Sequence, residues 1–135
     1  MRTHRLELDD QSLREWDAVV LASGPDGIVL EAPTSTLFWA TSDGTLRTTS
    51  LDAGILASIT RDRLIRELEV EEGEFGLDDV LGAREAFLAS TVREVQGVAS
   101  VDETQLPDCL GEQTKAAARA FAAVIERELA SSTSA

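Results

Sequence analysis

The stretch LFWATSDGTLRT, residues 37–48, decides the fold class of this chain. Its first four residues are apolar and mostly bulky, which is typical of a buried β-strand. Asp43-Gly44 follows, a dipeptide that favours the tight turn of a β-hairpin. Residues 45–48 then resume a strand-like pattern. We therefore predict two antiparallel strands, 37–40 and 45–48, joined by a turn at 42–44.

Further strands are predicted on both sides of this hairpin. Residues 18–22 form a short run rich in β-branched side chains, and a Gly-Pro-Asp-Gly turn separates them from a second extended segment at 28–32. We expect these two segments to form a hairpin of their own. Downstream, the sequence predicts two more strands and an acidic edge segment, at residues 85–90, 95–101 and 70–75.

Three helices complete the pattern. Residues 58–68 predict a helix that Ser58 or Thr60 can cap, and residues 77–81 predict a short helix that ends at Gly82. The longest predicted helix covers 111–130, and we expect one face of it to carry Ala118, Phe121, Ala122, Ile125 and Leu129. Strands outnumber helices and come mostly as hairpins. The fold class is therefore α+β, an antiparallel-rich sheet or partial β-barrel flanked by helices.

The length fits one domain. The chain has 135 residues, of which 43% are hydrophobic, and this is enough for a core. We expect a folded domain over residues 17–130 and a flexible tail over 131–135. Residues 1–16 are polar and charged, so we expect a poorly defined lead-in there, in which residues 10–16 can form a helix.

Composition excludes several classes of function. Lys and Arg number 12 against 25 Asp and Glu, a net charge of −13, which argues against nucleic acid or an anionic membrane as the main partner. No apolar run is long enough to span a bilayer, and the first residues lack the apolar core of a secretion signal, so we expect a cytoplasmic protein. Cys109 is the single cysteine, and we expect no role for it or for the single histidine, His4.

A few polar residues stand at the ends of predicted elements. Glu31 ends a buried-looking strand and precedes small residues, and its carboxylate can either reach solvent or serve a ligand. Ser58 and Thr60 precede a helix, where hydroxyls and N–H groups either cap the helix or bind an anion such as phosphate. Local chemistry alone favours capping. Ser90-Thr91 places two more hydroxyls directly after a predicted strand. No metal site is predicted, because the acidic run at 67–74 is typical of a solvated edge.

Taken together, these segments resemble the class IV aminotransferases. The resemblance extends from about residue 17 to about 128, and its motifs occur in the family's order at residues 29–39, 43–48, 54–61, 69–72 and 85–95. It is a resemblance to the C-terminal domain of the fold-type IV pyridoxal-phosphate enzymes. These are the branched-chain aminotransferases, the D-amino-acid aminotransferases and the aminodeoxychorismate lyases.

The resemblance implies a role for each of these polar residues toward pyridoxal phosphate. Glu31 corresponds to the carboxylate that pairs with the pyridine nitrogen and so lets the ring act as an electron sink. The residues that correspond to the phosphate side of the site are Ser58, Ile59, Thr60, Ser90 and Thr91. Two positions depart from the family, which usually has Gly where Ser58 stands and favours Asn at Thr36.

The resemblance also implies groups that this sequence does not contain. In the family, a Schiff-base lysine and a tyrosine lie upstream of the strand that begins here near Asp17, and a phosphate-binding arginine belongs to the N-terminal domain. This sequence has one lysine, Lys115, far downstream, and no tyrosine. We therefore expect a C-terminal half of an aminotransferase or lyase.

Three functions are compatible with such a half. In the first, a separate lysine-bearing N-terminal-half chain completes an enzyme that acts on a small amino-acid or aminodeoxychorismate-like substrate; a homodimer is the other partner that we consider. In the second, the chain is a non-catalytic module that binds pyridoxal phosphate or another anionic ligand. In the third, it is an inactive remnant.

Overall fold

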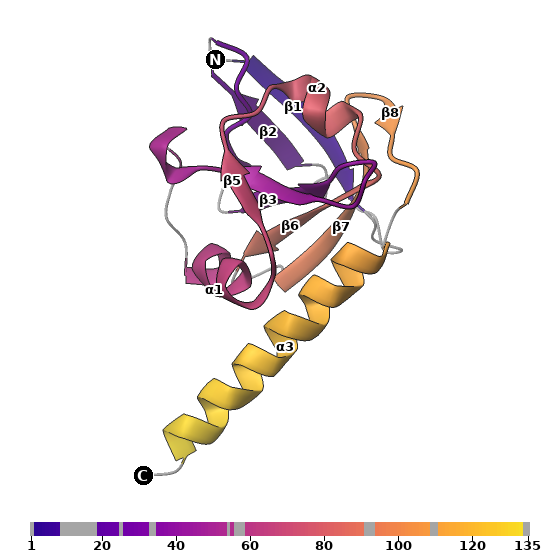
Figure 1. The fold of residues 1–135 in the computed structure, drawn as a ribbon. Coiled ribbons are helices and arrows are strands. Elements are labelled where there is room, and N and C mark those ends of the chain that lie inside the picture. The colour runs from indigo at the N-terminus through magenta and orange to yellow at the C-terminus, as the bar shows by residue number, and fades with distance from the viewer. Residues whose placement is uncertain are drawn as a thin grey trace.

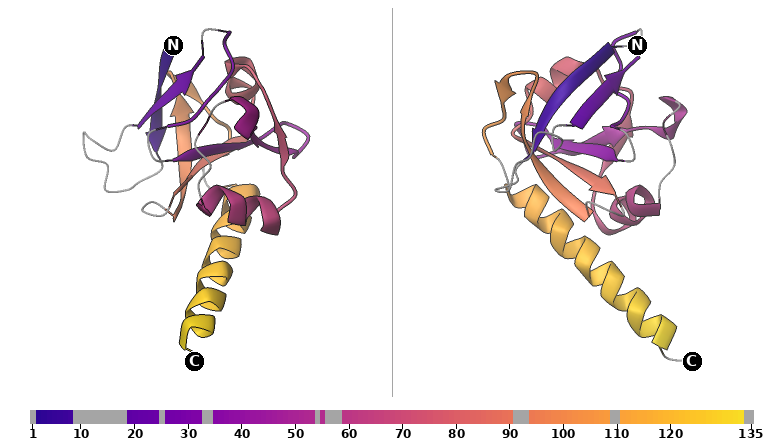
Figure 2. Two further views of the ribbon diagram at one scale, coloured as in Figure 1. Left: turned by 90° about the vertical axis from the view of Figure 1, so that its left-hand side faces the viewer. Right: turned by 180° about the vertical axis from the view of Figure 1, so that it is seen from behind.

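The fold is built on one mixed sheet that curls into a half-barrel (Figures 1 and 2). The computed structural model describes residues 2–8, 19–24, 26–32, 35–53, 55, 59–90, 94–108 and 111–133. Within these residues the sheet has eight strands: β1 (Arg2–Leu8), β2 (Val19–Ser23), β3 (Thr36–Ala40), β4 (Leu46–Thr49), β5 (Glu71–Gly73), β6 (Glu85–Ser90), β7 (Glu94–Val101) and β8 (Thr104–Gln105). The strand order is β2-β1-β7-β6-β3-β4-β5, with β8 paired to β7. The pairing of β4 with β5 is parallel and the other pairings are antiparallel. The predicted fold class is confirmed.

The central hairpin forms as the sequence predicts. Trp39 of β3 pairs with Arg47 of β4, and the turn between the strands places Gly44 at φ +92°. Asp43 stabilises this turn by accepting hydrogen bonds from the Thr41 hydroxyl and from the backbone N–H of Thr45, the latter at 3.1 Å. These hydrogen bonds, the one from Thr41 above all, lower the pKa of Asp43 to about 2.

The expected lead-in was wrong for residues 2–8. They form β1, which lies between β2 and β7, and its His4, Leu6 and Leu8 are buried in alternation with exposed residues. The signal was weak because only two of the seven residues are apolar, and the strand's partners are distant in sequence. The suggested helix at 10–16 lies outside the described residues.

The expected hairpin at 18–32 is present in part. β2 forms its first arm, whereas the second arm makes an isolated bridge between Ser23 and Val29. The backbone N–H of Ala22 also donates to the carbonyl of Glu31 at 3.0 Å. This arrangement keeps Glu31 beside β2.

Helices cover the two faces of the sheet unequally. Helices α1 (Ile59–Glu67) and α3 (Glu112–Thr133) lie on the outer face, while the short α2 (Leu77–Leu81) packs on the inner face and ends at Gly82 as predicted (Figure 1). A 3₁₀ turn at Leu51–Ala53 follows β4. The later turns of α3 extend beyond the sheet (Figure 2).

Alternation along each strand separates two cores. On β3, Leu37 and Trp39 belong to the inner core, whereas Phe38 belongs to the outer core. Phe38 stacks on Phe87 of β6, with ring centroids 5.1 Å apart. Leu64 of α1 packs into the same outer core.

The expected apolar face of α3 was right at Phe121 and Ile125, which pack in the outer core, and wrong at the other three positions. The buried positions are Thr114, Ala117, Phe121 and Val124, while Ala118 and Ala122 are exposed and Leu129 is 61% exposed. Alanines stand at six positions between 116 and 123, so they mark several sides of the helix as apolar. The rotation of α3 about its axis is instead set by Phe121 and by the first turn of the helix, which is hydrogen-bonded to β6.

Candidate functional site

Three buried hydroxyl residues lie where the inner face of the sheet ends. Leu37 of β3 pairs with Leu88 of β6 on the inner face. Two residues away from this pair come Ser90, the last residue of β6, and Ser35, which directly precedes β3, and continued alternation places both on this same face. They are 4% and 5% exposed, and Thr49 at the end of β4 is 1% exposed. The inner face therefore changes from aliphatic to hydroxyl-bearing at this end.

Glu31 is held at the same end of the sheet. The Thr49 hydroxyl donates to the carbonyl of Val29 at 2.9 Å, and the backbone N–H of Ser35 donates to the carbonyl of Ala32 at 3.1 Å. Both bonds connect the segment around Glu31 to β3 and β4. Glu31 itself is half-buried.

The first turn of α1 is attached to this end by a buried arginine. Arg61, 4% exposed, donates from Nη2 to the carbonyl of Thr49 at 2.8 Å and to Oε1 of Glu72 at 2.5 Å. Thr60 beside it is 4% exposed, whereas Ile59 is 67% exposed. The first N–H groups of a helix have no partners within the helix and carry its positive dipole end. The start of α1 therefore brings partial positive charge to the hydroxyl-bearing end.

Most of the sequence-predicted site residues come together here. Glu31, Thr60 and Ser90 lie at this end, with Ile59 on the exposed start of α1, while Ser58 and Thr91 lie outside the described residues. Sequence reasoning missed Ser35, Thr49 and Arg61. The available signals were that Ser35 belongs to the small-residue run after Glu31 and that Arg61 directly follows Thr60.

The combined chemistry suits a ligand with two different ends. A carboxylate such as that of Glu31 pairs with a protonated ring nitrogen, whereas hydroxyls and helix N–H groups bind phosphate oxygens. Both kinds of group are present within the ends of β3, β4 and β6 and the start of α1. We call this set of residues the sheet-end site.

A second polar array involves the only histidine of the sequence. Nδ1 of His4 lies 2.7 Å from Oδ2 of Asp102, and its Nε2 lies 3.0 Å from the hydroxyl of Ser23. The order resembles a hydrolase triad, but Ser23 is only 2% exposed, so its hydroxyl is closed off from a substrate. The array connects β1, β2 and the turn after β7, so its role is structural. The expectation of a loose N-terminus around His4 was wrong.

The same array perturbs the titration of Asp102. Burial raises the pKa of this carboxyl, but hydrogen bonds from the Arg5 backbone N–H and from His4, together with the charge of His4, outweigh burial and lower it. The backbone bond measures 2.8 Å. Asp102 itself adopts a left-handed conformation, with φ of +52°.

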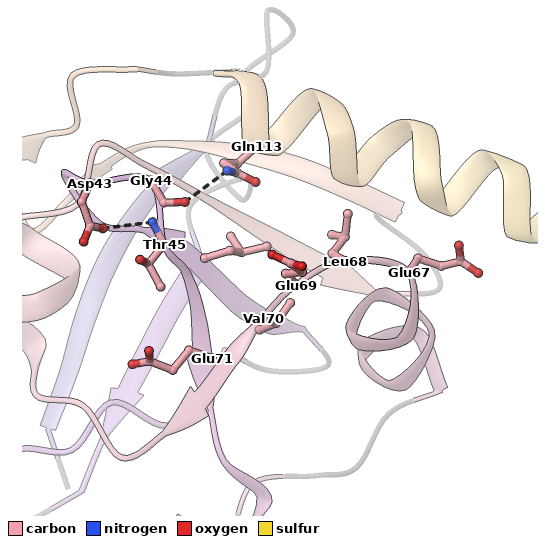
Figure 3. Close-up of a pocket in the computed structure, with 10 residues that line it drawn as sticks. Asp43, Gly44, Thr45, Glu67, Leu68, Glu69, Val70, Glu71 and Gln113 are labelled. Carbon is pink, nitrogen blue, oxygen red and sulfur yellow. Dashed lines mark hydrogen bonds between the residues drawn. The ribbon is translucent and has the colours of Figure 1, made fainter.

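The acidic segment forms an open groove of about 630 Å³ between the β3–β4 turn and the connection from α1 to β5 (Figure 3). Its carboxylates come from Asp43, Glu67, Glu69 and Glu71, all exposed to solvent. Glu71 also pairs with Arg47, at 3.0 Å. No grouping of three or more potential metal ligands occurs in the part of the chain that the structure describes.

Comparison with known proteins identifies the family. The family model described as amino-transferase class IV matches residues 5–101. The chain belongs to the class IV aminotransferases. The match begins inside β1, so the region matched by the class IV family model includes part of the strand that the sequence did not predict.

Individual relatives show the same relationship. Aminodeoxychorismate lyase of Bacillus subtilis (strain 168) is 33% identical over 96 residues, which are 67% of this chain and 32% of that protein. Branched-chain amino acid aminotransferase from Thermobaculum terrenum, solved in its PLP-form (holo-form), superposes with a TM-score of 0.73 at 33% identity over 78% of this chain and 36% of that one. The Escherichia coli branched-chain amino acid aminotransferase gives 0.72 at 30% identity, over 77% and 37%. The class IV chain described here thus spans about a third of the length of these relatives.

One further property concerns membranes. Across the described residues of this class IV chain, none of the helices combines the length and apolar character that crossing a lipid bilayer requires.

Proposed function

We propose that the sheet-end site forms one wall of a pyridoxal-phosphate site in an aminotransferase or aminodeoxychorismate lyase. The observation that carries the proposal is the convergence of Glu31, Thr60 and Ser90 at one end of the sheet, although they are separated by 59 residues of sequence. The family match and a relative solved in its PLP-form support it.

The residues present fit this cofactor. Glu31 would hold the protonated pyridine nitrogen, and the first N–H groups of α1 with the Thr60 hydroxyl would hold the phosphate. Ser58, Ser90 and Thr91 complete the phosphate side in this proposal. When bound, the cofactor supplies an electron sink for bonds broken at the substrate's α-carbon. An independent sign of fit is a buried Ser35 hydroxyl at this end that lacks a hydrogen-bond partner among the described residues.

The amine required for Schiff-base chemistry would come from another polypeptide segment. Lys115, the single lysine of the sequence, is exposed on the first turn of α3, beside the start of β6. The sheet-end site lies at the opposite end of β6. We propose a lysine-bearing N-terminal-half chain as the source of this amine, and a small amino-acid or aminodeoxychorismate-like substrate; a homodimer is the other assembly we propose, and it would bring no lysine besides Lys115.

If no partner supplies a lysine, the distance of Lys115 from the sheet-end site favours a second function. The chain would then bind pyridoxal phosphate or another anionic ligand without turnover, or persist as an inactive remnant.

Titration with pyridoxal phosphate tests the proposal. Binding is measured by equilibrium dialysis and by the cofactor's visible absorption, for the wild type and for Glu31→Gln and Thr60→Ala. We expect saturable binding that both substitutions weaken. Glu112→Gln, an exposed change at the other end of β6, is the matched control and should leave the affinity unchanged. Equal affinity in all variants would refute the sheet-end site.

Borohydride treatment tests the source of the amine. Because the chain's one lysine lies away from the site, we expect borohydride to fix no cofactor covalently to wild-type protein at stoichiometric loading. Stoichiometric fixation that Lys115→Arg abolishes would contradict this part of the proposal.

A further inference from the structure

The hydroxyl of Ser35 is the starting point, because it is buried and unsatisfied. Ser35 is 4% exposed, and its Oγ has no hydrogen-bond partner among the residues that the structure describes. A buried hydroxyl without a partner destabilises the folded state, since it has lost its hydrogen bonds to water. Such groups are rare in folded proteins and call for a specific explanation.

The backbone N–H of Ser35 has a hydrogen-bond partner, unlike the hydroxyl. Its N–H donates to the carbonyl of Ala32 at 3.1 Å, and Ala32 and Ser35 form an antiparallel bridge. The turn is thus closed by main-chain bonds and does not need the hydroxyl.

The position of Ser35 places this hydroxyl among the binding groups. It lies four residues after Glu31 and directly before Thr36, which pairs with Ala89 next to Ser90. Thr49 and the buried Arg61 approach the same end from β4 and α1. Ser35 therefore lies at the same end of the sheet as the other residues of the sheet-end site.

We propose that Ser35 is a further ligand-binding residue, whose hydroxyl donates to an anionic oxygen of bound pyridoxal phosphate and is satisfied only in the complex. The inference rests on the proposed function and adds to it a residue outside the set predicted from the sequence. A serine hydroxyl is compact and rotates freely, so it can meet such an oxygen without any backbone movement. Both the phosphate oxygens and the phenolic oxygen attached to the pyridine ring offer that acceptor.

If this is correct, Ser35→Ala does not destabilise the ligand-free protein but weakens its binding of pyridoxal phosphate. The ligand-free variant should melt at the same temperature as the wild type or higher, because the substitution removes an unsatisfied polar atom. Its Kd for pyridoxal phosphate should rise about tenfold, the loss expected for a hydrogen bond to a charged acceptor. Ser100→Ala, a buried serine of β7 that is 5% exposed and paired with Gln105, is the control and should leave this Kd unchanged.

The same experiment shows which oxygen of the ligand Ser35 contacts. It also distinguishes failure of this inference from failure of the proposed function. Pyridoxal and inorganic phosphate are titrated alongside pyridoxal phosphate, and a selective loss with one of them identifies the oxygen that Ser35 contacts. A lower melting temperature of ligand-free Ser35→Ala, with unchanged Kd, would show that the hydroxyl is structural and overturn the inference. If Glu31→Gln weakens binding while Ser35→Ala does not, the inference alone fails. If neither does, the proposed function fails as well.

Discussion

Glu85 fastens the longest helix to the sheet, and replacing it should destabilise the protein strongly. Glu85 begins β6 and is 3% exposed. Its Oε1 accepts hydrogen bonds from the backbone N–H and the hydroxyl of Thr114, both at 2.7 Å, and its Oε2 accepts from the N–H of Gln113 at 3.2 Å. The carboxylate thus satisfies two of the N–H groups that the first turn of α3 leaves without helical partners.

The magnitude for Glu85→Gln follows from what the amide cannot do. It keeps one oxygen for Thr114, but loses the negative charge at a buried helix N-terminus, which contributes up to about 2 kcal/mol. Its NH₂ group also replaces the acceptor for Gln113, a loss of about 1 kcal/mol. We expect the free energy of unfolding to fall by about 2–3 kcal/mol. With an unfolding entropy of about 2.1 cal/mol/K per residue, the melting temperature falls by about 7–11 °C.

Thermal and urea unfolding, followed by far-UV circular dichroism, measure this loss. Glu112→Gln is the matched control, because Glu112 lies in the same first turn but is exposed, so its charge contributes only about 0.3–1 kcal/mol. Gly111→Ala is an independent probe, because a Cβ there would collide with the Glu85 carboxylate. A loss for Glu85→Gln no larger than for Glu112→Gln would refute the reasoning.

Three other predictions address the rest of the fold. Hydrogen bonds from the Arg5 backbone and from His4 hold the pKa of Asp102 below its ordinary value of 3.8. This carboxylate therefore stabilises the protein above that pH, and its contribution is lost as pH falls through the folded-state pKa. Urea unfolding from pH 7 down to pH 2 should show Asp102→Asn less stable than the wild type near neutrality, with the difference shrinking toward the acid end. Leu64→Ala, at a fully buried position between α1 and the sheet, should lower the free energy of unfolding by about 2–5 kcal/mol in urea titrations, and an effect below 1 kcal/mol would mean that α1 is not packed as described. Gly44→Ala should lower the free energy of unfolding by about 1–2 kcal/mol, measured by calorimetry. The loss would come from the φ of +92° alone, because no atom lies within 4 Å of the added Cβ.

Local chemistry in the sequence was sufficient for the elements whose partners are close in the chain. The β3–β4 hairpin follows from Asp43-Gly44 between apolar runs, and the end of α2 follows from Gly82. β1 was missed because its partners, β2 and β7, are distant, so nothing within residues 2–8 signals the pairing. The face of α3 was predicted only in part, at Phe121 and Ile125, because alanine fits either environment and the contact that sets the rotation of the helix comes from β6.

The candidate site was predictable only in part for a similar reason. Glu31 and Thr60 were found through their motifs, but nothing in the sequence shows that Arg61 reaches back to the end of β4 or that the hydroxyl of Ser35 is left unsatisfied. Both properties depend on the register between β3, β4 and β6. A change of one residue in that register would turn these side chains to the other face of the sheet.

The two ends of β6 also constrain how the site could work. Thr114, the neighbour of Lys115, is bonded to Glu85 at the first residue of β6, whereas the sheet-end site surrounds Ser90 at its last. A strand of this length spans about 17 Å, more than twice the reach of a lysine side chain. Because this length exceeds the reach of the side chain, Lys115 does not bring its amine to the sheet-end site of its own chain. Lys115→Ala should therefore leave the affinity for pyridoxal phosphate unchanged, and an amine that reacts with the bound ligand would have to come from a residue other than this chain's own Lys115.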